Sequence, residues 1–488
     1  MVFHRMNGRH TALALGIAAA LLLPLGAHAD PQSSGKTKSS SSSSAKEQAL
    51  ENRVSQLESE LAELKDMLRQ QQSQQQQQAQ QVQQVQQQQQ VQQAQAEKVV
   101  AAAPKSTFES APGLSVALHG FISASAFSQT KNMSFGNGQN AEYPIPKSAA
   151  APYSGSLSGV DIRNTRFWLD FKGAKFNDSW TGGGRIEMDF FGGFNGTGPY
   201  SEQQPVPRLR QAYMDITNKE SGTTFRVGEQ WNLMFPLDII PTSLSHIAFP
   251  LGFGNGMIGW RFPGVVWMQD LNSGDGPRWR VDVGAFSGNW NGPGDNVNYL
   301  TAGNAGFRPQ IEARVSVKDK AWMAFFAAHW SQIDLRGVGQ AVNPPIKDSI
   351  TSTAYELGGQ WKPGSWTFKG FIYTGNGIGQ IFGDLSQFGD ISDKGGYFQV
   401  GYNFTPKWSV NAYYGQSRPD QGDVRRWVAL SAFPRLNNRQ SAMSLQYATG
   451  AYELGIEYLY SKLKYATTAT EDKSLSGSQV SLNAMYKF

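Results

Sequence analysis

The last nine residues read Val480-Ser481-Leu482-Asn483-Ala484-Met485-Tyr486-Lys487-Phe488. Apolar side chains at every second position alternate with a set that is polar apart from one methionine. Because successive side chains of a β-strand point to opposite faces, this segment predicts a strand with one apolar face and one wetter face. The apolar face ends on Tyr486 and Phe488, which is typical of the interfacial aromatic girdle of a transmembrane β-barrel. The alternative is a soluble β-sandwich that ends on phenylalanine by chance.

The same alternation extends upstream to about residue 114. In Arg185-Ile186-Glu187-Met188-Asp189-Phe190, every second side chain is charged and the others are apolar. Such a strand is expected where lipid lies on one side and a water-filled lumen on the other. We count about sixteen runs and predict an all-β membrane fold, a 16-stranded antiparallel transmembrane β-barrel over residues 114–488. The runs begin near Val116, Asn164, Gly184, Arg210, Thr223, Met257, Arg278, Pro309, Trp322, Ser352, Trp366, Gly396, Trp408, Gln440, Tyr452 and Ser478.

The connections between these runs alternate in length. Short ones, such as 318–320 and 405–407, recur at every second gap, and long ones, such as 129–160 and 418–438, fill the others. Short turns on one rim and long loops on the opposite rim are the asymmetry of outer-membrane barrels. An even number of strands returns the C-terminus to the rim with the short turns, which is the periplasmic one.

The third long loop, residues 231–256, is apolar, and Asp238 and His246 are its only ionisable side chains. An apolar loop is not expected to stand in water, so we predict that it folds into the barrel and narrows the channel. Trp231, Asp238 and His246 are our candidate constriction residues. The alternative is a loop that contacts a second subunit. His246 alone does not indicate a metal site or a catalytic base.

Four segments precede the barrel. Residues 1–29 predict a secretory signal peptide, with two arginines, a short apolar run and Ala27-His28-Ala29 before the cleavage point; a membrane anchor would need a longer apolar run. Residues 30–45 are Ser-rich and predicted to be disordered. Residues 46–70 carry apolar residues at heptad spacing and predict a periplasmic coiled coil, with a lone amphipathic helix as the alternative. Residues 71–113 predict a Gln-rich spacer and linker.

The chain of 488 residues contains no cysteine and has a formal net charge of +5. The absence of cysteine excludes disulfides, a lipid anchor on cysteine and thiolate metal sites. Composition alone would allow the Gln tract to bind nucleic acid, but an exported protein argues against that partner. We predict no metal and no cofactor.

Basic residues on the lumen-facing positions are the candidate solute contacts. A guanidinium group binds a carboxylate through two parallel hydrogen bonds, so arginines suit a pore for anions. The alternative is that these groups pair with inward carboxylates such as Asp170 and Glu187 and stiffen the wall. Arg163 and Arg210 fall on the other face and need a bulge or a rim position. By strand parity, the inward candidates are Arg166, Arg185, Arg226, Arg261, Arg280, Arg314 and Lys369.

The sequence resembles the DcaP-type porins, a family of trimeric outer-membrane channels for dicarboxylates. The likeness is carried by the coiled coil ahead of the barrel and by four motifs: Asn164-Thr165-Arg166-Phe167, Arg185 to Gly192, Arg208-Leu209-Arg210-Gln211-Ala212-Tyr213 and Val227-Gly228-Glu229-Gln230-Trp231. The resemblance implies a 16-stranded homotrimer, a periplasmic extension, an inward constriction loop and a basic eyelet that favours dicarboxylates. The terminal Tyr486 and Phe488 likewise resemble the signal that the outer-membrane assembly machinery reads.

Together these features predict a passive outer-membrane porin of a Gram-negative bacterium for small anionic solutes, with dicarboxylates as the expected class. The expected partners are outer-membrane lipid and lipopolysaccharide, two further copies of the chain, the assembly machinery and, for the coiled coil, peptidoglycan. One alternative is an unselective diffusion porin with the same fold. Less favoured are a trimeric autotransporter-type adhesin, since one chain here supplies enough strands to close alone, and an enzyme, since no nucleophile motif accompanies the few histidines.

Overall fold

The computed structural model describes residue 65 and residues 107–111, 113–134, 138–139, 142–147, 154–192, 205–287, 309–335, 347–382, 385, 387–430 and 433–488. The chain divides into two units, residues 1–103 and 104–488. In the first unit only Lys65 is described, and it lies in a helix. The predicted signal peptide and Ser-rich segment therefore lie outside the described residues, and so does the predicted coiled coil apart from Lys65. In the described part of the chain, no helix is long and apolar enough to cross a membrane.

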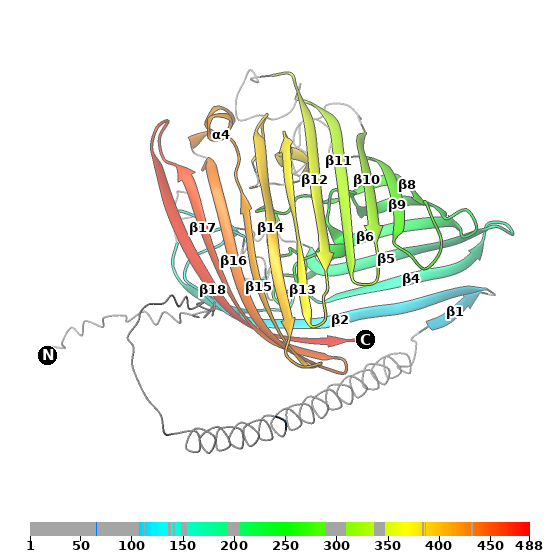
Figure 1. Cartoon of the computed structure of the whole chain (residues 1–488). Coiled ribbons are helices and arrows are strands. Elements are labelled where there is room, and N and C mark those ends of the chain that lie inside the picture. Colours follow the sequence, from blue (N-terminus) through cyan, green and yellow to red (C-terminus); the bar gives the residue numbers. More distant parts are fainter. Residues whose placement is uncertain are drawn as a thin grey trace, which may run out of the picture. The chain divides into compact units, whose positions relative to one another are not determined.

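The second unit is the predicted 16-stranded antiparallel β-barrel (Figure 1). Each strand pairs antiparallel with its neighbours in sequence, and the last strand pairs with β2 to close the ring. The strands of the described ring are β2 (Leu114–Gln129), β4 (Arg166–Lys175), β5 (Trp180–Gly192), β6 (Val206–Asn218), β7 (Thr223–Trp231), β8 (Arg261–Asp270), β9 (Arg278–Phe286), β10 (Gln310–Lys318), β11 (Trp322–Asp334), β12 (Ser349–Trp361), β13 (Trp366–Asn376), β14 (Ser392–Asn403), β15 (Trp408–Ser417), β16 (Arg435–Thr449), β17 (Tyr452–Ala466) and β18 (Asp472–Lys487).

Two short strands supplement the ring. The strand β3 (Leu157–Asp161) pairs with the second half of β2, while β4 pairs with its first half, so β3 and β4 are two parts of one interrupted strand. The strand β1 (Thr107–Ala111) pairs with the start of β2 and lies within residues 71–113, which we predicted to be a spacer and linker. The long connections also contain η2 (Leu237–Ile239), α3 (Gly379–Phe382) and α4 (Gln421–Trp427).

The outer face carries an aromatic girdle beside the short turns. Aromatic residues lie directly opposite each other on neighbouring strands at this level. Phe488 continues the girdle past the end of β18, because its backbone N–H and C=O each bond to Gly120 at 3.0 Å. Rings at this position suit the boundary between hydrocarbon and water. The opposed pairs are Trp322 with Trp361, Trp366 with Tyr402, Trp408 with Tyr447, and Tyr452 with Tyr486.

The inside of the barrel differs from the sequence expectation on one side. Inward positions of β11 to β15 hold large apolar side chains, including Phe325, Phe371 and Tyr397, which are buried in one hydrophobic cluster. Residues of the long connection between β7 and β8, such as Phe235 and Ile239, belong to the same cluster. Much of this half of the barrel interior is therefore a packed apolar core, whereas ion pairs between arginines and carboxylates, such as Arg185 with Asp170 and Arg226 with Asp215, lie on the wall from β4 to β9.

Candidate functional site

The connection between β7 and β8, residues 232–260, lies inside the barrel. We call it the inner loop. It hydrogen-bonds to the wall all around the ring, through β10, β13, β14, β16 and β17 and through the break between β3 and β4. Leu237 and Asp238, in η2, are exposed, while most of the loop is buried. The loop therefore divides the lumen and leaves η2 at the edge of open water.

The near end of the inner loop is held by charged wall residues. The carboxylate of Glu312 on β10 accepts hydrogen bonds from the Leu233 N–H at 2.7 Å and the Asn232 side chain at 2.9 Å. Arg314 donates to the carbonyl oxygens of Leu233 and Phe235 at 3.4 and 3.3 Å. Two of our candidate solute contacts, Arg314 and Lys369, thus hold the loop in place: the Lys369 ammonium donates to the Ile240 carbonyl at 2.7 Å.

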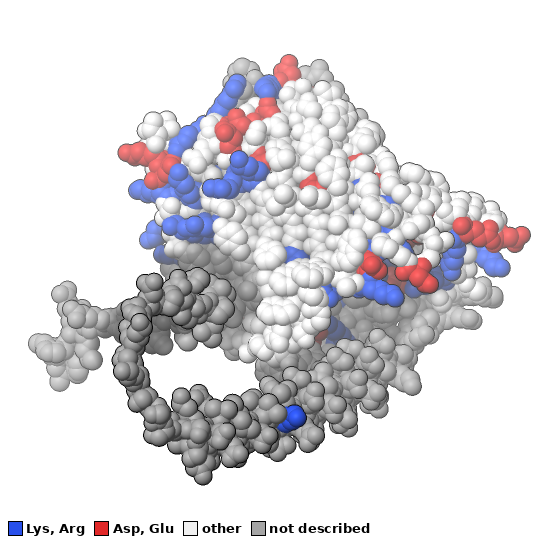
Figure 2. Space-filling view, in the orientation of Figure 1, with Lys and Arg blue, Asp and Glu red and all other residues white. Residues whose placement is uncertain are grey.

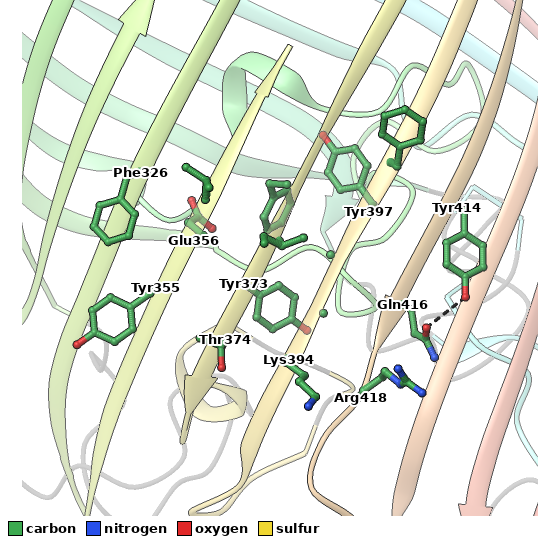
Figure 3. A pocket seen from close by; sticks show the side chains of 16 residues that line it. Phe326, Tyr355, Glu356, Tyr373, Thr374, Lys394, Tyr397, Tyr414, Gln416 and Arg418 are labelled. Atoms are coloured by element: carbon green, nitrogen blue, oxygen red, sulfur yellow. Dashed lines mark hydrogen bonds between the residues drawn. The ribbon is translucent and has the colours of Figure 1, made fainter. Parts of the chain in front are cut away.

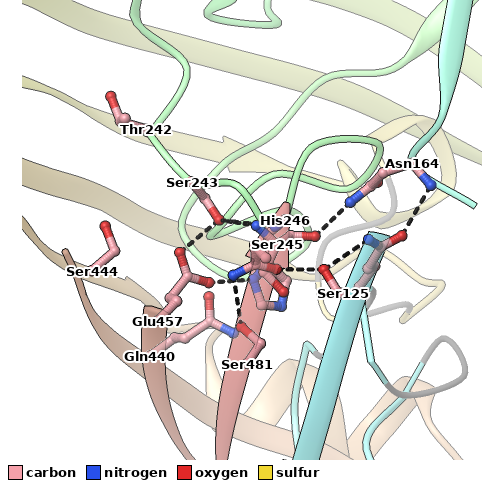
Figure 4. A network of polar contacts seen from close by, with 12 residues as sticks. Ser125, Asn164, Thr242, Ser243, Ser245, His246, Gln440, Ser444, Glu457 and Ser481 are labelled. Atoms are coloured by element: carbon pink, nitrogen blue, oxygen red, sulfur yellow. Dashed lines mark hydrogen bonds and ion pairs between the residues drawn. The ribbon is translucent and has the colours of Figure 1, made fainter. Parts of the chain in front are cut away.

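The far end of the inner loop is anchored on β17 (Figure 4). Glu457 accepts a hydrogen bond from the Ser243 hydroxyl at 2.6 Å and lies 2.7 Å from Nδ1 of His246, and the Glu457 and His246 side chains are almost fully buried. This is not the arrangement of a hydrolytic triad, because the serine bonds to the acid and not to the imidazole. The candidate residue His246 therefore positions the loop.

The first candidate constriction residue, Trp231, ends β7 and stacks on Phe235 with ring centroids 3.8 Å apart. Its ring also lies near the guanidinium groups of Arg210 and Arg261, at 5.7 and 5.0 Å. Asp238 is half exposed and lies 3.5 Å from Arg314. The three predicted constriction residues therefore all belong to the inner loop or its first anchor, but they do not meet at one point.

Three of the predicted arginines pair with carboxylates of the wall. Arg185 forms two hydrogen bonds with Asp170 at 2.7 and 3.0 Å. Arg226 does the same with Asp215, and Arg280 with Asp282 through one bond of 2.6 Å. For these three arginines the alternative interpretation, a wall stiffened by ion pairs, describes the structure.

A cluster with excess positive charge lies between the wall and the inner loop. Its guanidinium groups come from Arg166, Arg208, Arg210 and Arg261, and its carboxylates are Glu187 and Asp189. Arg210 bridges the two acids at 2.6 Å each, and Arg208 binds Asp189 at 2.7 and 3.0 Å. Four cations thus face two anions. We call these six residues the arginine cluster.

Two arginines of this cluster have buried nitrogens without a hydrogen-bond partner among the described residues. They are Nε and Nη2 of Arg166, and Nε and Nη1 of Arg261. Arg166 lies 3.6 Å from Glu187, and Arg261, only 3% exposed, sits between the rings of Trp231 and Trp260 at 5.0 Å from each. Buried guanidinium donors are costly to leave unpaired. The arrangement is therefore able to bind a small anion between the wall and the loop.

Sequence parity placed Arg210 on the other face and therefore required a bulge or a rim position. The strand β6 contains such a bulge, at which Gln211 opposes Glu187 and Leu209 opposes Met188. Arg210 is the extra residue, and it turns inward. Arg163 was the other exception, and it lies in the break between β3 and β4, where it pairs with Asp161 at 2.7 Å. The Arg208-Leu209-Arg210 motif indicated a cluster at this place in the sequence. Two arginines that are two residues apart cannot both be explained on the lipid-facing side of a strand.

No protein-family model and no curated protein sequence matches the chain. Among solved structures, the chain is similar to the outer membrane channel DcaP of Acinetobacter baumannii, with 18% identity, a TM-score of 0.59, and coverage of 78% of this chain and 99% of that one. It also matches OmpT of Vibrio cholerae in its trimer form at 12% identity, with a TM-score of 0.47 and coverage of 77% and 100%. OmpF of Salmonella typhi matches at 11% identity, with a TM-score of 0.47 and coverage of 78% and 100%.

The likeness to the DcaP channel establishes the fold. The chain has the fold of an outer-membrane porin, a 16-stranded antiparallel barrel.

Proposed function

We propose that the chain is a passive porin of a Gram-negative outer membrane that prefers small anionic solutes, with dicarboxylates as the favoured class. The fold and the aromatic girdle support the location. The preference is supported by the arginine cluster, in which four guanidinium groups face two carboxylates and four guanidinium nitrogens lack partners in the described structure. The single observation that carries the proposal is the pair of unsatisfied groups on Arg166 and Arg261, because such donors bind carboxylates.

The test is the reversal potential of the channel in a planar bilayer under a gradient of potassium chloride. We expect the sign of an anion-preferring pore, and we expect succinate or phthalate to block the current transiently. Substituting Arg166→Gln together with Arg261→Gln removes the two excess charges and should abolish both the preference and the block. A pore that prefers cations in the unaltered protein would refute the proposal.

The matched control is the double substitution Arg226→Gln and Asp215→Asn. It also removes an arginine from the inward face of the same wall sector, but it leaves the net charge unchanged because the partner is neutralised with it. We expect its reversal potential to equal that of the unaltered protein. If the unaltered protein shows no preference between anions and cations, the chain is an unselective diffusion porin, which is the second candidate function.

We also infer that the porin is a homotrimer whose protomers meet on the outer face of β4 to β7. Outward positions there carry aliphatic side chains such as Ile186 and Met214. We expect Met214→Lys to lose the SDS-resistant trimer and the control Ile456→Lys, on β17, to keep it. A Met214→Lys variant that still migrates as an SDS-resistant trimer would contradict this interface.

A further inference from the structure

The extracellular ends of four neighbouring strands present a row of basic side chains on the outer face of the barrel. They are Lys394 on β14, Arg418 directly after β15, Arg439 on β16 and Lys462 on β17. Lys394, Arg418 and Arg439 are exposed and Lys462 is half-buried, and none of the four has an ion-pair partner among the described residues. Figure 2 shows blue side chains gathered over these strand ends, above a largely white surface. We call these four residues the basic row.

Two members of the basic row lie directly opposite each other. Arg439 pairs with Lys462 across β16 and β17, and its other direct neighbour, Gln416 on β15, is uncharged. Like charges at opposed positions destabilise a sheet unless a ligand of opposite sign compensates them. The repulsion is thus a second observation, independent of exposure, that indicates an anionic partner for this surface.

The depth of the basic row matches a layer of lipid headgroups. Arg439 precedes Tyr447, a girdle residue, by eight residues on β16. At ~3.3 Å per residue and a tilt of about 40°, these positions differ in depth by roughly 20 Å, against an apolar band about 25 Å tall. The row therefore lies near the outer-leaflet edge of the apolar band, from where the long side chains of lysine and arginine reach the phosphates of the headgroup layer.

An apolar groove leads away from the basic row along the outer wall (Figure 3). Its upper part has a cavity volume of ≈ 680 Å³ and is lined by Lys394 and Arg418 at the mouth and by Tyr355, Ile372 and Phe398 below them. A second hollow of ≈ 750 Å³ shares Leu357, Ile372 and Phe398 with the first and continues to Trp322 and Trp361 in the girdle. The two hollows form one groove.

The groove exists because glycines occupy outward positions in its floor, where other residues would place a side chain. Gly359 on β12 lies opposite Gly370 on β13, and Gly396 on β14 lies opposite Ile372. Outward positions on either side keep large groups, with Ile372 65% and Phe398 52% exposed. A channel of hydrocarbon width with a cationic mouth is complementary to an amphiphile that has an anionic head and an extended acyl chain.

We propose that this surface, the basic row with its groove, is a binding site for the phosphorylated glycolipid of the outer leaflet, with phosphates on the basic row and one acyl chain in the groove. The proposal rests on the proposed outer-membrane location. The groove lies on β12 to β14, away from the β4–β7 face that we assign to the trimer contact, and it is bordered by Trp322 and Trp361 of the aromatic girdle.

The experiment uses the full-length mature protein in a mild non-ionic detergent, with native mass spectrometry to measure the binding of hexa-acyl, diphosphoryl lipid A. The test variant carries Lys394→Gln, Arg418→Gln, Arg439→Gln and Lys462→Gln. We expect its affinity for lipid A to fall at least tenfold. The matched control carries Lys318→Gln, Lys320→Gln, Lys362→Gln and Lys407→Gln, which remove the same charge from exposed positions at the other rim, and its affinity should change less than threefold.

A second variant tests the groove without changing any charge. Ile372→Trp fills the hollow and should weaken lipid A binding about fivefold, whereas Ile456→Trp, on the outward face of β17, should not. Equal losses in the test and control sets, or equal affinity for dephosphorylated lipid A, would overturn the proposal. Equal affinity for phosphatidylglycerol would assign the site to any anionic lipid and overturn the glycolipid assignment.

The outcome is separable from the porin proposal. Channel conductance and reversal potential are measured in phospholipid bilayers that contain no lipid A, so the channel can fail there while lipid binding persists. Conversely, a conducting, anion-preferring channel that binds no lipid A refutes only the glycolipid site.

Discussion

Two sectors of the same barrel wall have different interiors. From β4 to β9, the lumen side carries ion pairs and the arginine cluster. From β11 to β15, the lumen side carries the large rings of a packed apolar core, and the outer side has a groove. The inner loop joins the two, with buried apolar residues on the core and charged wall residues bonded to its first half, residues 232–246.

The difference shows that a barrel of this fold does not need a uniform lumen. The packed half supplies a rigid surface on which the inner loop rests, because interiors at native density resist displacement. The loop then lies against the charged half, where the four guanidinium groups of the arginine cluster face two carboxylates. Packing thus fixes the position of the loop, and the charge on the opposite wall determines which solutes pass beside it.

The largest expected effect comes from a large-to-small substitution in the packed sector. Phe371→Ala removes a ring that is 3% exposed and contacts Tyr397 at 5.2 Å between centroids. We expect the free energy of unfolding to fall by about 3–5 kcal/mol, the usual cost of a large-to-small change in a core. Guanidinium titration of the barrel in detergent measures it. Phe398→Ala, one strand away on the outer face and 52% exposed, is the control and should cost far less; equal costs would mean that this half is not a core.

The next effect concerns a buried acid in the first long loop. Burial raises the pKa of Glu142 well above its usual range, although Arg435 and the Ser134 hydroxyl act in the opposite direction. The folded loop therefore favours the protonated acid. This contribution is full below the pKa of the unfolded chain and is lost as pH rises through the folded pKa, so the loop should loosen with rising pH. Hydrogen exchange of residues 142–147 measures this loosening.

Glu142→Gln is the matching variant for this pH dependence. It keeps the shape and the neutral state, so its exchange rates, corrected for intrinsic pH dependence, should stay flat between acid and alkaline pH. A variant whose corrected rates rise with pH as steeply as those of the unaltered protein would show that another group controls the loop.

A smaller effect should follow from releasing the far anchor of the inner loop. Glu457→Gln removes the carboxylate that binds Ser243 and His246 and leaves one buried partner unsatisfied. The expected cost is about 1–3 kcal/mol. Because the loop, and not the wall, is loosened, single-channel recordings should show more frequent current fluctuations with an unchanged fully open conductance. A matched Gln399→Ala variant on β14 removes the side chain that accepts a hydrogen bond from the N–H of Thr242 in the loop, and it should act in the same direction. Quiet recordings from both variants would argue that the loop does not bound the pore.

Much of this architecture could be predicted from sequence, because alternation reports which positions face lipid. All of the predicted runs coincide with strands of the ring, although the run placed near Met257 begins at Arg261, since residues 257–260 are apolar and belong to the inner loop. The loop's inward fold followed from its apolar composition. The packed half could not be predicted: in Phe368-Lys369-Gly370-Phe371-Ile372-Tyr373 both faces carry large rings, and alternation does not then reveal which face is wet.

The candidate site could be predicted only in part. Parity found Arg166 and Arg261, but it could not show that Arg185, Arg226 and Arg280 pair with carboxylates, because the partners lie on neighbouring strands whose register depends on turn geometry. For Arg210 it required a bulge or a rim position and could not decide between them; the structure has the bulge, in β6.

The smallest expected effect concerns the paired arginines of the charged sector. Arg226 binds Asp215 through two hydrogen bonds of 2.8 Å and stacks on Tyr213 at 3.7 Å, yet about a quarter of its side chain stays exposed. Arg226→Lys keeps the charge but loses the two-point geometry and the stacking, so we expect a loss of about 1 kcal/mol or less. The reversal potential should not change, because the net charge is kept. Arg166→Lys also keeps the charge but alters the unsatisfied donors of the arginine cluster, so it should weaken the succinate block. If Arg226→Lys weakens the block as much, solutes contact the paired wall, and the distinction between paired and unpaired arginines fails.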